Sequence, residues 1–263
     1  MSSDNLLVSI TNGIATLTLN RPEVHNAFDD ILIKNLTEIL QQLNNNVDVR
    51  VVILTANGKS FSAGADINWM RRMVSYSEQE NLQDALKLAG LMRTLYNLNK
   101  PTLGLIQGAA YGGGVGLVAC CDIAIASKQA GFCLSEVKLG LIPAVIGPYV
   151  LAAIGERAAR RYFLTAEYFD AHEAQRIGLI QLITDDENTL KTTGRRMAEN
   201  LLDKGPQAMC AAKKFIAEIV HQSIDEKLIK FSAETIAKLR IGTEGQEGLS
   251  AFLEKRTPQW IDQ

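Results

Sequence analysis

The sequence lacks the residue patterns that mark several large classes of protein. Its four cysteines include no CxxC pair and its three histidines no HExxH spacing, so we expect neither a metal site nor a disulfide framework. No apolar run approaches the roughly 18 residues of a membrane span. The 27 Lys and Arg residues are balanced by 29 Asp and Glu, which gives no electrostatic reason to expect nucleic acid or a membrane as a partner. The first twenty residues contain no Lys or Arg, unlike a secretory signal, so we expect a cytoplasmic protein.

The 263 residues, 47% of them apolar, suffice for one large domain with a well-filled core. Strand-like runs at 6–10 and 14–19 predict a hairpin, and apolar residues at helical spacing from 28 to 43 predict a helix. The mostly apolar run 49–55 is typical of a strand in a parallel sheet covered on both faces. Strand, glycine turn and helix recur, and beyond Pro143 the pattern is helical. We therefore predict an α/β core over residues 1–195 and a helical C-terminal region over 196–263.

Two segments of small residues are candidate ligand sites. Residues 61–67 (FSAGADI) follow a strand and a turn, and would let a ligand reach peptide N–H groups. The same segment could be an ordinary turn into a helix capped by Asp66. Residues 112–116 (GGGVG) lie between a predicted strand and a helix, and could aim a helix N-terminus at an anion. The alternative there is close packing of the helix on the strand, and the spacing is not the dinucleotide-binding fingerprint.

The third candidate is Glu136, the only carboxylate between Asp122 and Glu156. Its neighbourhood is strongly apolar. Burial there would disfavour the charged form and suit a general acid or base that works near neutral pH. The alternative is a salt bridge to Lys138 on an exposed turn.

Taken together and in order, these segments resemble the enoyl-CoA hydratase/isomerase, or crotonase, family. The residues that carry the resemblance are Arg21-Pro22 with Asn26-Ala27, FSAGAD at 61–66, the glycines at 112–114 with Cys121-Asp122-Ile123, and Glu136 followed by LGLIP at 139–143. The resemblance covers the chain from the first hairpin to the C-terminal helices. It implies a spiral of repeated β-β-α turns, with a helical C-terminal region that contributes to homo-trimers or hexamers.

The resemblance also implies the chemistry of the site. The substrate would be an acyl-CoA thioester, so coenzyme A is part of the substrate and no metal or further cofactor is expected. The main-chain N–H groups of Ala65 and Gly113 would polarise the thioester carbonyl, and Glu136 would move protons. Contacts to the substrate and its CoA group, largely through main-chain atoms, are implied for Val24, His25, Ala27, Ala63, Asp66, Ile67, Gly112 and Gly116.

Gly116 is a departure from the pattern of this family. Typical hydratases of the family hold water between two glutamates, and Gly116 stands at the position of the first one. The remaining carboxylate, Glu136, could add water across the 2,3 double bond of an enoyl-CoA. It could equally move a proton between carbons, as a Δ3,Δ2-enoyl-CoA isomerase does. The third alternative is an acyl-CoA-binding protein with little catalytic activity.

Neighbouring sequence favours hydration. Residues 132–137 and 154–162 resemble the bacterial branch of methylglutaconyl-CoA hydratases of leucine degradation. Arg157, Arg160 and Arg161 could pair with a free carboxylate of such a substrate, but solvent-facing positions on a helix are the preferred interpretation.

Overall fold

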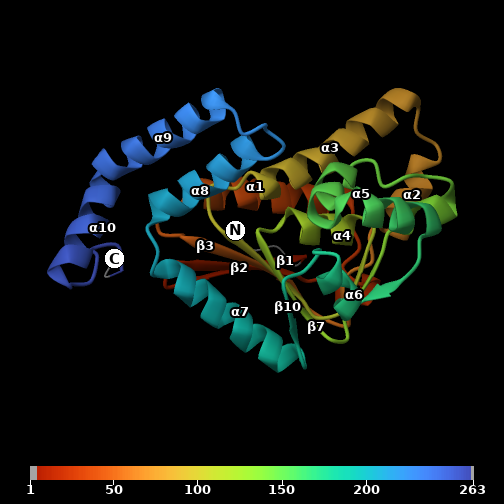
Figure 1. The fold of residues 1–263 in the computed structure, drawn as a ribbon. Helices are drawn as coiled ribbons and strands as arrows, with labels where there is room; N and C mark the ends of the chain where they lie inside the picture. Colours follow the sequence, from red (N-terminus) through yellow and green to blue (C-terminus); the bar gives the residue numbers. More distant parts are fainter. Residues whose placement is uncertain (1–4, 262–263) are drawn as a thin grey trace.

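The chain repeats a unit of two strands and a helix, and this repeat builds two sheets (Figure 1). The structure is a computed structural model that describes residues 5–261. The strands are β1 (Leu6–Thr11), β2 (Ile14–Leu19), β3 (Val51–Ala56), β4 (Ser60–Ser62), β5 (Thr102–Ile106), β6 (Ala109–Tyr111), β7 (Ile123–Ser127), β8 (Gly131–Cys133), β9 (Phe169–Asp170) and β10 (Leu182–Thr184). The helices are η1 (Pro22–Val24), α1 (Asp30–Asn45), α2 (Ile67–Met73), α3 (Glu78–Tyr96), α4 (Gly113–Cys120), η2 (Glu136–Leu139), α5 (Gly147–Thr165), α6 (Ala171–Arg176), α7 (Glu187–Leu202), α8 (Pro206–Ile219), α9 (Glu226–Ile241) and α10 (Thr243–Glu254).

The β-β-α repeat confirms the predicted spiral. The larger sheet has the strand order β1-β2-β3-β5-β7-β10 and the smaller one β4-β6-β8-β9. In the turns β3-β4-α2, β5-β6-α4 and β7-β8-α5, the first strand joins the larger sheet and the second joins the smaller. Successive turns therefore place the ends of β4, β6 and β8 next to one another, and the segments that follow these strands gather at one edge.

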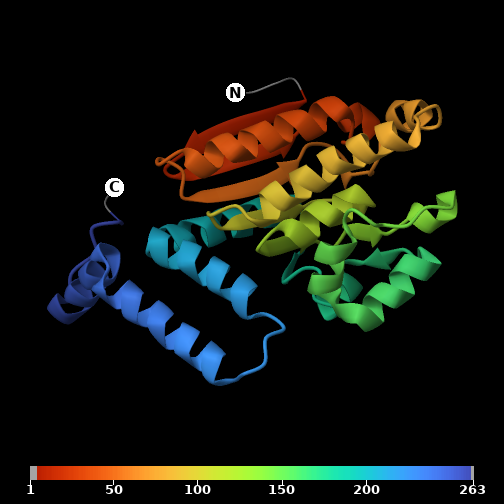
Figure 2. The same ribbon diagram turned by 90° about the horizontal axis from the view of Figure 1, so that it is seen from above.

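Strand β3 shows why the apolar run 49–55 predicts a buried strand. Val51 and Ile53 pack with Leu190 of α7 on one face of the larger sheet, whereas Val52 and Leu54 belong to the main core on the other face. Figure 1 shows α7 on one side of this sheet and α1 with α3 on the other, and Figure 2 shows α1 and α3 side by side. Both faces are covered, so every position of the strand is apolar or nearly so.

The N-terminal elements follow their predictions closely. Strands β1 and β2 form an antiparallel hairpin, and Asn12 and Gly13 in its turn have φ of 49° and 75°. Asp29 is the N-cap of α1, since its side chain accepts a hydrogen bond of 2.7 Å from the Leu32 N–H. Phe28 lies before the helix and is buried, because its main chain pairs with Ala65 instead of continuing α1.

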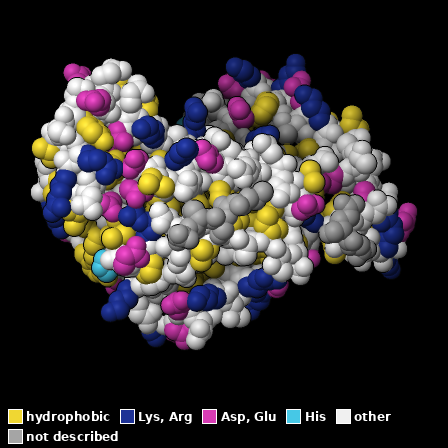
Figure 3. Space-filling model, turned by 180° about the vertical axis from the view of Figure 1, so that it is seen from behind, with side chains coloured by type: hydrophobic (Ala, Val, Ile, Leu, Met, Phe, Trp, Pro, Cys, Tyr) yellow, Lys and Arg dark blue, Asp and Glu magenta, His cyan; other side chains and the backbone are white. Residues whose placement is uncertain are grey.

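The region beyond Pro143 is less purely helical than predicted. β9 pairs with β8 and β10 with β7, so two short strands interrupt the helices. The predicted boundary at residue 195 falls inside α7, which packs on the larger sheet, and the division into two domains stays a prediction. Helices α8 to α10 project from the core (Figures 1 and 2). No helix within residues 5–261 is long and apolar enough to cross a membrane. Acidic and basic side chains are interspersed over the face shown in Figure 3.

Candidate active site

Two loops pack main chain against main chain after the parallel strands β4 and β6. A Cβ on Gly64 would lie 3.1 Å from the carbonyl oxygen of Tyr111, and one on Gly114 would lie 2.7 Å from the carbonyl oxygen of Ser62. Gly64 also has φ of 86°, a conformation that side chains disfavour. The glycines thus allow the close packing that was one interpretation of their pattern. This contact fixes the 62–65 loop against the start of α4.

The N–H of Ala65 points away from the Phe28 segment with which Ala65 pairs. Phe28 N–H donates to the Gly64 carbonyl at 2.6 Å, and Asp66 N–H donates to the Phe28 carbonyl at 2.8 Å. Ala65 is the residue between these two bonds, and in a parallel ladder the N–H of that residue faces the opposite side. Ala65 is exposed, and the part of the chain that the structure describes offers no acceptor to its amide.

Gly113 provides a second amide of the same kind. It is the first residue of α4, so its N–H has no acceptor within the helix, and the helix dipole adds positive potential there. The preceding Gly112 has φ of 47° and donates its own N–H to the Cys133 carbonyl at 2.9 Å. A Cβ on Gly113 would lie 2.9 Å from the Phe28 ring. Phe28 therefore touches both segments that carry the amides of Ala65 and Gly113.

Glu136 opens η2 and lies beside the same glycines. Its Oε1 is 3.1 Å from the place a Cβ on Gly112 would take. Its Oε2 is buried and lacks a hydrogen-bond partner within residues 5–261. Burial raises the pKa of Glu136, with an opposing effect from a hydrogen bond of its own main chain. The alternative salt bridge is wrong, because none of the ion pairs among the described residues joins Glu136 to the exposed Lys138.

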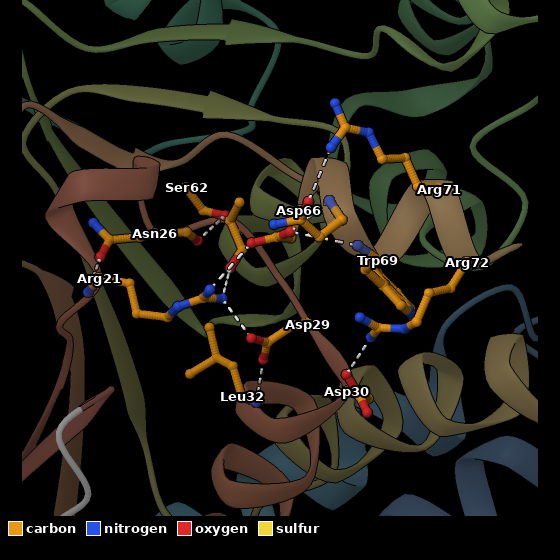
Figure 4. A network of polar contacts seen from close by, with 12 residues as sticks. Arg21, Asn26, Asp29, Asp30, Leu32, Ser62, Asp66, Trp69, Arg71 and Arg72 are labelled. Atoms are coloured by element: carbon orange, nitrogen blue, oxygen red, sulfur yellow. Dashed lines mark hydrogen bonds and ion pairs between the residues drawn. The ribbon is translucent and has the colours of Figure 1, made fainter.

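A half-buried ionic network holds the loop that carries Ala65 (Figure 4). The Arg21 guanidinium pairs with Asp29 at 2.8 Å and with Asp66 at 3.1 Å. Asp66 caps α2 by accepting from the N–H groups of Asn68 and Trp69. Burial alone would raise the pKa of Asp66, but these main-chain bonds and Arg21 together lower it. The Asp66 side chain is thus engaged inside the protein, as the capping interpretation predicts, and its main-chain N–H and carbonyl are bonded to Phe28 and Met70.

The η1 loop is bound to the 60–63 segment. His25 Nδ1 lies 3.1 Å from the Ser60 Oγ, and the His25 carbonyl accepts from the Ala63 N–H at 2.9 Å. His25 and Asn26 both have φ of 54°, and the buried Asn26 side chain stabilises this turn by donating to the carbonyls of Asn57 and Ser60. The role of Asn26 was not predicted from the sequence. The available sequence signal is the residue type itself, because Asn tolerates the left-handed backbone of a tight turn.

The remaining predicted contact residues divide into accessible and buried ones. Val24 is half-buried, while Ile67, at the start of α2, is 67% exposed. Ala27 is buried and offers no exposed side chain. Gly116 is also buried, so the predicted substrate contact of Gly116 does not fit its position. Side chains of Ile146 and Met92 cover Gly116.

The arginines of α5 face solvent, as the preferred interpretation held. Arg160 pairs with Glu156 at 3.3 Å, and Arg161 pairs with Glu167 at 2.6 Å. Arg157 is exposed, and it lines a surface hollow between α5 and α6 together with Arg160 and Arg161. All three side chains are on the surface of that helix, and Arg160 and Arg161 are each paired with a glutamate.

The chain belongs to the enoyl-CoA hydratase/isomerase family, whose model matches residues 9–263. A solved structure of an enoyl-CoA hydratase from Shewanella pealeana is 47% identical, with a TM-score of 0.94, and the match covers 97% of this chain and 96% of that one. The short-chain-enoyl-CoA hydratase of Clostridium acetobutylicum is 31% identical over 97% of each chain. The mitochondrial Delta(3,5)-Delta(2,4)-dienoyl-CoA isomerase of Dictyostelium discoideum is also 31% identical, over 93% of this chain and 86% of its own length. The relatives therefore include both hydratases and isomerases.

Proposed function

We propose that this protein is an enoyl-CoA hydratase in which Glu136 moves the proton and the amides of Ala65 and Gly113 hold the thioester oxygen. The observation that carries this proposal concerns Glu136, whose Oε2 is buried and has no hydrogen-bond partner within residues 5–261. Its Oε1 lies beside Gly112, the residue before Gly113, and the Gly113 amide at the start of α4 has no acceptor among the same residues. Two main-chain donors suit the negative charge that develops on a thioester oxygen, and removing one such donor typically costs about 2.7–4 kcal/mol of transition-state stabilisation.

The proposed steps need only these groups and water. Glu136 takes a proton from water while the water oxygen bonds to C3 of the 2-enoyl-CoA. The electrons of the double bond move to the thioester oxygen, where the amides of Ala65 and Gly113 stabilise the enolate. Glu136 then returns its proton to C2, and the product is the 3-hydroxyacyl-CoA. The raised pKa of Glu136 supports both halves of this cycle near neutral pH. No metal or further cofactor takes part in these steps.

The second candidate function is Δ3,Δ2-enoyl-CoA isomerisation. It is favoured by the glycine at 116, which leaves a single carboxylate, and an isomerase stands among the relatives. One acid can take a proton from C2 and return it to C4 on the same face of the substrate.

Heavy-oxygen water distinguishes the two reactions. With a 2-enoyl-CoA as substrate, we expect a 3-hydroxyacyl-CoA that contains one heavy oxygen atom per turnover, detected by mass spectrometry. With a 3-enoyl-CoA, isomerisation alone would give an unlabelled 2-enoyl-CoA. If the 3-enoyl-CoA is converted at a substantial rate and no product ever carries the label, the result would contradict the proposed hydratase and support the isomerase.

We propose methylglutaconyl-CoA, or a related short-chain enoyl-CoA, as the substrate. The support is the similarity of residues 132–137 and 154–162 to that branch of hydratases. Because Arg160 and Arg161 are paired on the surface, they do not account for recognition of a free carboxylate. A comparison of kcat/KM for straight, branched and carboxylated 2-enoyl-CoAs tests this part, and a preference for straight chains without the carboxylate would contradict it.

We also propose that the chain forms homo-trimers or hexamers through its C-terminal helices. Large apolar side chains on this region are exposed in the single chain, among them Ile224 (87%), Ile241 (80%) and Phe252 (81%). Exposed apolar residues gathered on one region mark interaction surfaces. Sedimentation equilibrium is expected to give three or six times the chain mass, and Phe252→Ser is expected to lower it. A monomeric wild-type protein at micromolar concentration would contradict the proposal.

A further inference from the structure

Gly112 precedes α4 as its N-cap, with φ of 47°, and Gly116 lies inside the helix. The Gly116 N–H donates to the Gly112 carbonyl at 3.2 Å, so the two glycines are one turn apart. Glu136 covers the first, since its Oε1 is 3.1 Å from where a Cβ of Gly112 would be. Ile146 covers the second, with its Cγ2 only 2.3 Å from where a Cβ of Gly116 would be. Glu136 and Ile146 thus cover two glycines that lie one turn apart.

Ile146 leaves no space at this position for another group. It is 2% exposed, and Met92, whose Cε is 3.2 Å from the same Cβ position, is fully buried. Any side chain at residue 116 would need the volume that Ile146 occupies. The Ile146 and Met92 atoms nearest to this position are apolar, whereas a buried water normally needs two to four polar partners.

The titratable groups around Glu136 are few. Lys138 on η2 is exposed, and Cys133 on β8 is buried. Tyr149 on α5 has Cys120, Arg93 and Tyr96 as its charged or titratable neighbours. Residues 113–120 of α4 include no acidic or basic side chain.

We propose that Ile146 is a positioning residue for Glu136, which seals the adjacent turn of α4 against water and against a second acid–base side chain. Glu136 is therefore the only proton carrier, and water reaches it only from the side of the substrate. This inference rests on the proposed function of Glu136 and adds the residue that keeps its surroundings dry.

Ile146→Ser tests the seal, because a hydroxyl and a smaller side chain admit water next to Glu136. We expect the acidic limb of the pH profile of kcat/KM to move to lower pH by about one unit, with a loss in kcat and little change in KM. Ile146→Val, which keeps a branched apolar side chain, is expected to retain the wild-type pH profile. The matched control is Ile154→Ser, the same exchange at a buried position inside α5, which is expected to lower stability without moving the limb.

A second set of variants tests the contact itself. Gly116→Ala places a Cβ against Ile146 and is expected to lower Tm. Adding Ile146→Ala removes the Cγ2 in the way, so the double variant is expected to be more stable than the sum of the two single effects predicts. A folded Ile146→Ser protein with a wild-type pH profile, or a Gly116→Ala protein as stable as wild type, would overturn the inference. If Glu136→Gln retains full turnover, the proposed function itself fails, whatever the Ile146 variants do.

Discussion

Glu136→Gln is expected to lower kcat for hydration by about 10³-fold, because an amide cannot accept the proton of water or return one to C2. The amides of Ala65 and Gly113 belong to the main chain and remain in place, so the affinity for an acyl-CoA is expected to stay within a few-fold of wild type. Stopped-flow or steady-state assays give kcat, and calorimetric titration with a non-reactive acyl-CoA gives Kd.

Glu156→Gln is the matched control for this prediction. Glu156 is an exposed carboxylate of α5 that pairs with Arg160, and its loss is expected to leave turnover unchanged. Full activity in Glu136→Gln would remove Glu136 from the mechanism. A loss of acyl-CoA binding equal to the loss of turnover would assign the residue to binding instead.

Glu136→Gln is also expected to stabilise the protein at neutral pH. Burial raises the folded-state pKa of Glu136 above its unfolded value. The protonated form therefore favours the folded state at low pH, and this contribution is lost as the pH rises through the folded-state pKa. Gln stays neutral throughout, so Tm of the variant is expected to exceed that of wild type at pH 7 and to match it near pH 4. Equal Tm values at both pH values would show that the carboxylate is well solvated.

Gly114→Ala is expected to lower kcat/KM by about 10²-fold or more, since displacements near 1 Å can have such an effect. The new Cβ would lie 2.7 Å from the Ser62 carbonyl oxygen, which is main chain and cannot rotate away. The 62–65 loop and the start of α4 must then separate, and the amides of Ala65 and Gly113 can no longer both donate to one thioester oxygen. Unlike Glu136→Gln, this variant is expected to weaken the binding of enolate-like inhibitors.

Gly90→Ala serves as the control for Gly114→Ala. A Cβ at Gly90 of α3 would meet no atom within 4 Å, and Ala favours a helix over Gly. Its activity is expected to equal that of wild type, with a slightly higher Tm. If Gly114→Ala is as active as Gly90→Ala, the close packing of the two loops does not position the amides.

The long, regular elements could be predicted from the sequence, whereas the short strands β9 and β10 could not. The alternation of β1 and β2 and the periodicity of α1 are local patterns. β9 has two residues and β10 has three, too few for any period to appear, and both form because a neighbouring strand is already in place. Helix α4 begins at Gly113, inside the glycine segment that was predicted to precede the helix. Glycine has low helix propensity, and the first turn depends on packing against Phe28 and Ser62.

The site was predictable to the extent that its chemistry resides in sequence motifs. Glu136 stands out as a lone carboxylate in an apolar stretch. The Ala65 and Gly113 amides are main-chain donors, and the sequence shows only small residues at their positions. The family resemblance was therefore needed to assign them roles. The pairs Arg21–Asp66 and Gly116–Ile146 are separated by 45 and 30 residues, and no local pattern connects them. Their contacts arise only when the β-β-α turns stack.

The central claim, that two amides hold the thioester oxygen beside Glu136, is tested most directly by the carbonyl stretching band of the bound substrate. Glu136→Gln loaded with a 2-enoyl-CoA carrying ¹³C at the thioester carbonyl allows isotope-edited difference infrared spectroscopy without turnover. We predict that this band moves to lower wavenumber than in water, and that the shift is largely lost when Gly114→Ala is added. A bound substrate whose carbonyl band stays at its position in water would contradict the account.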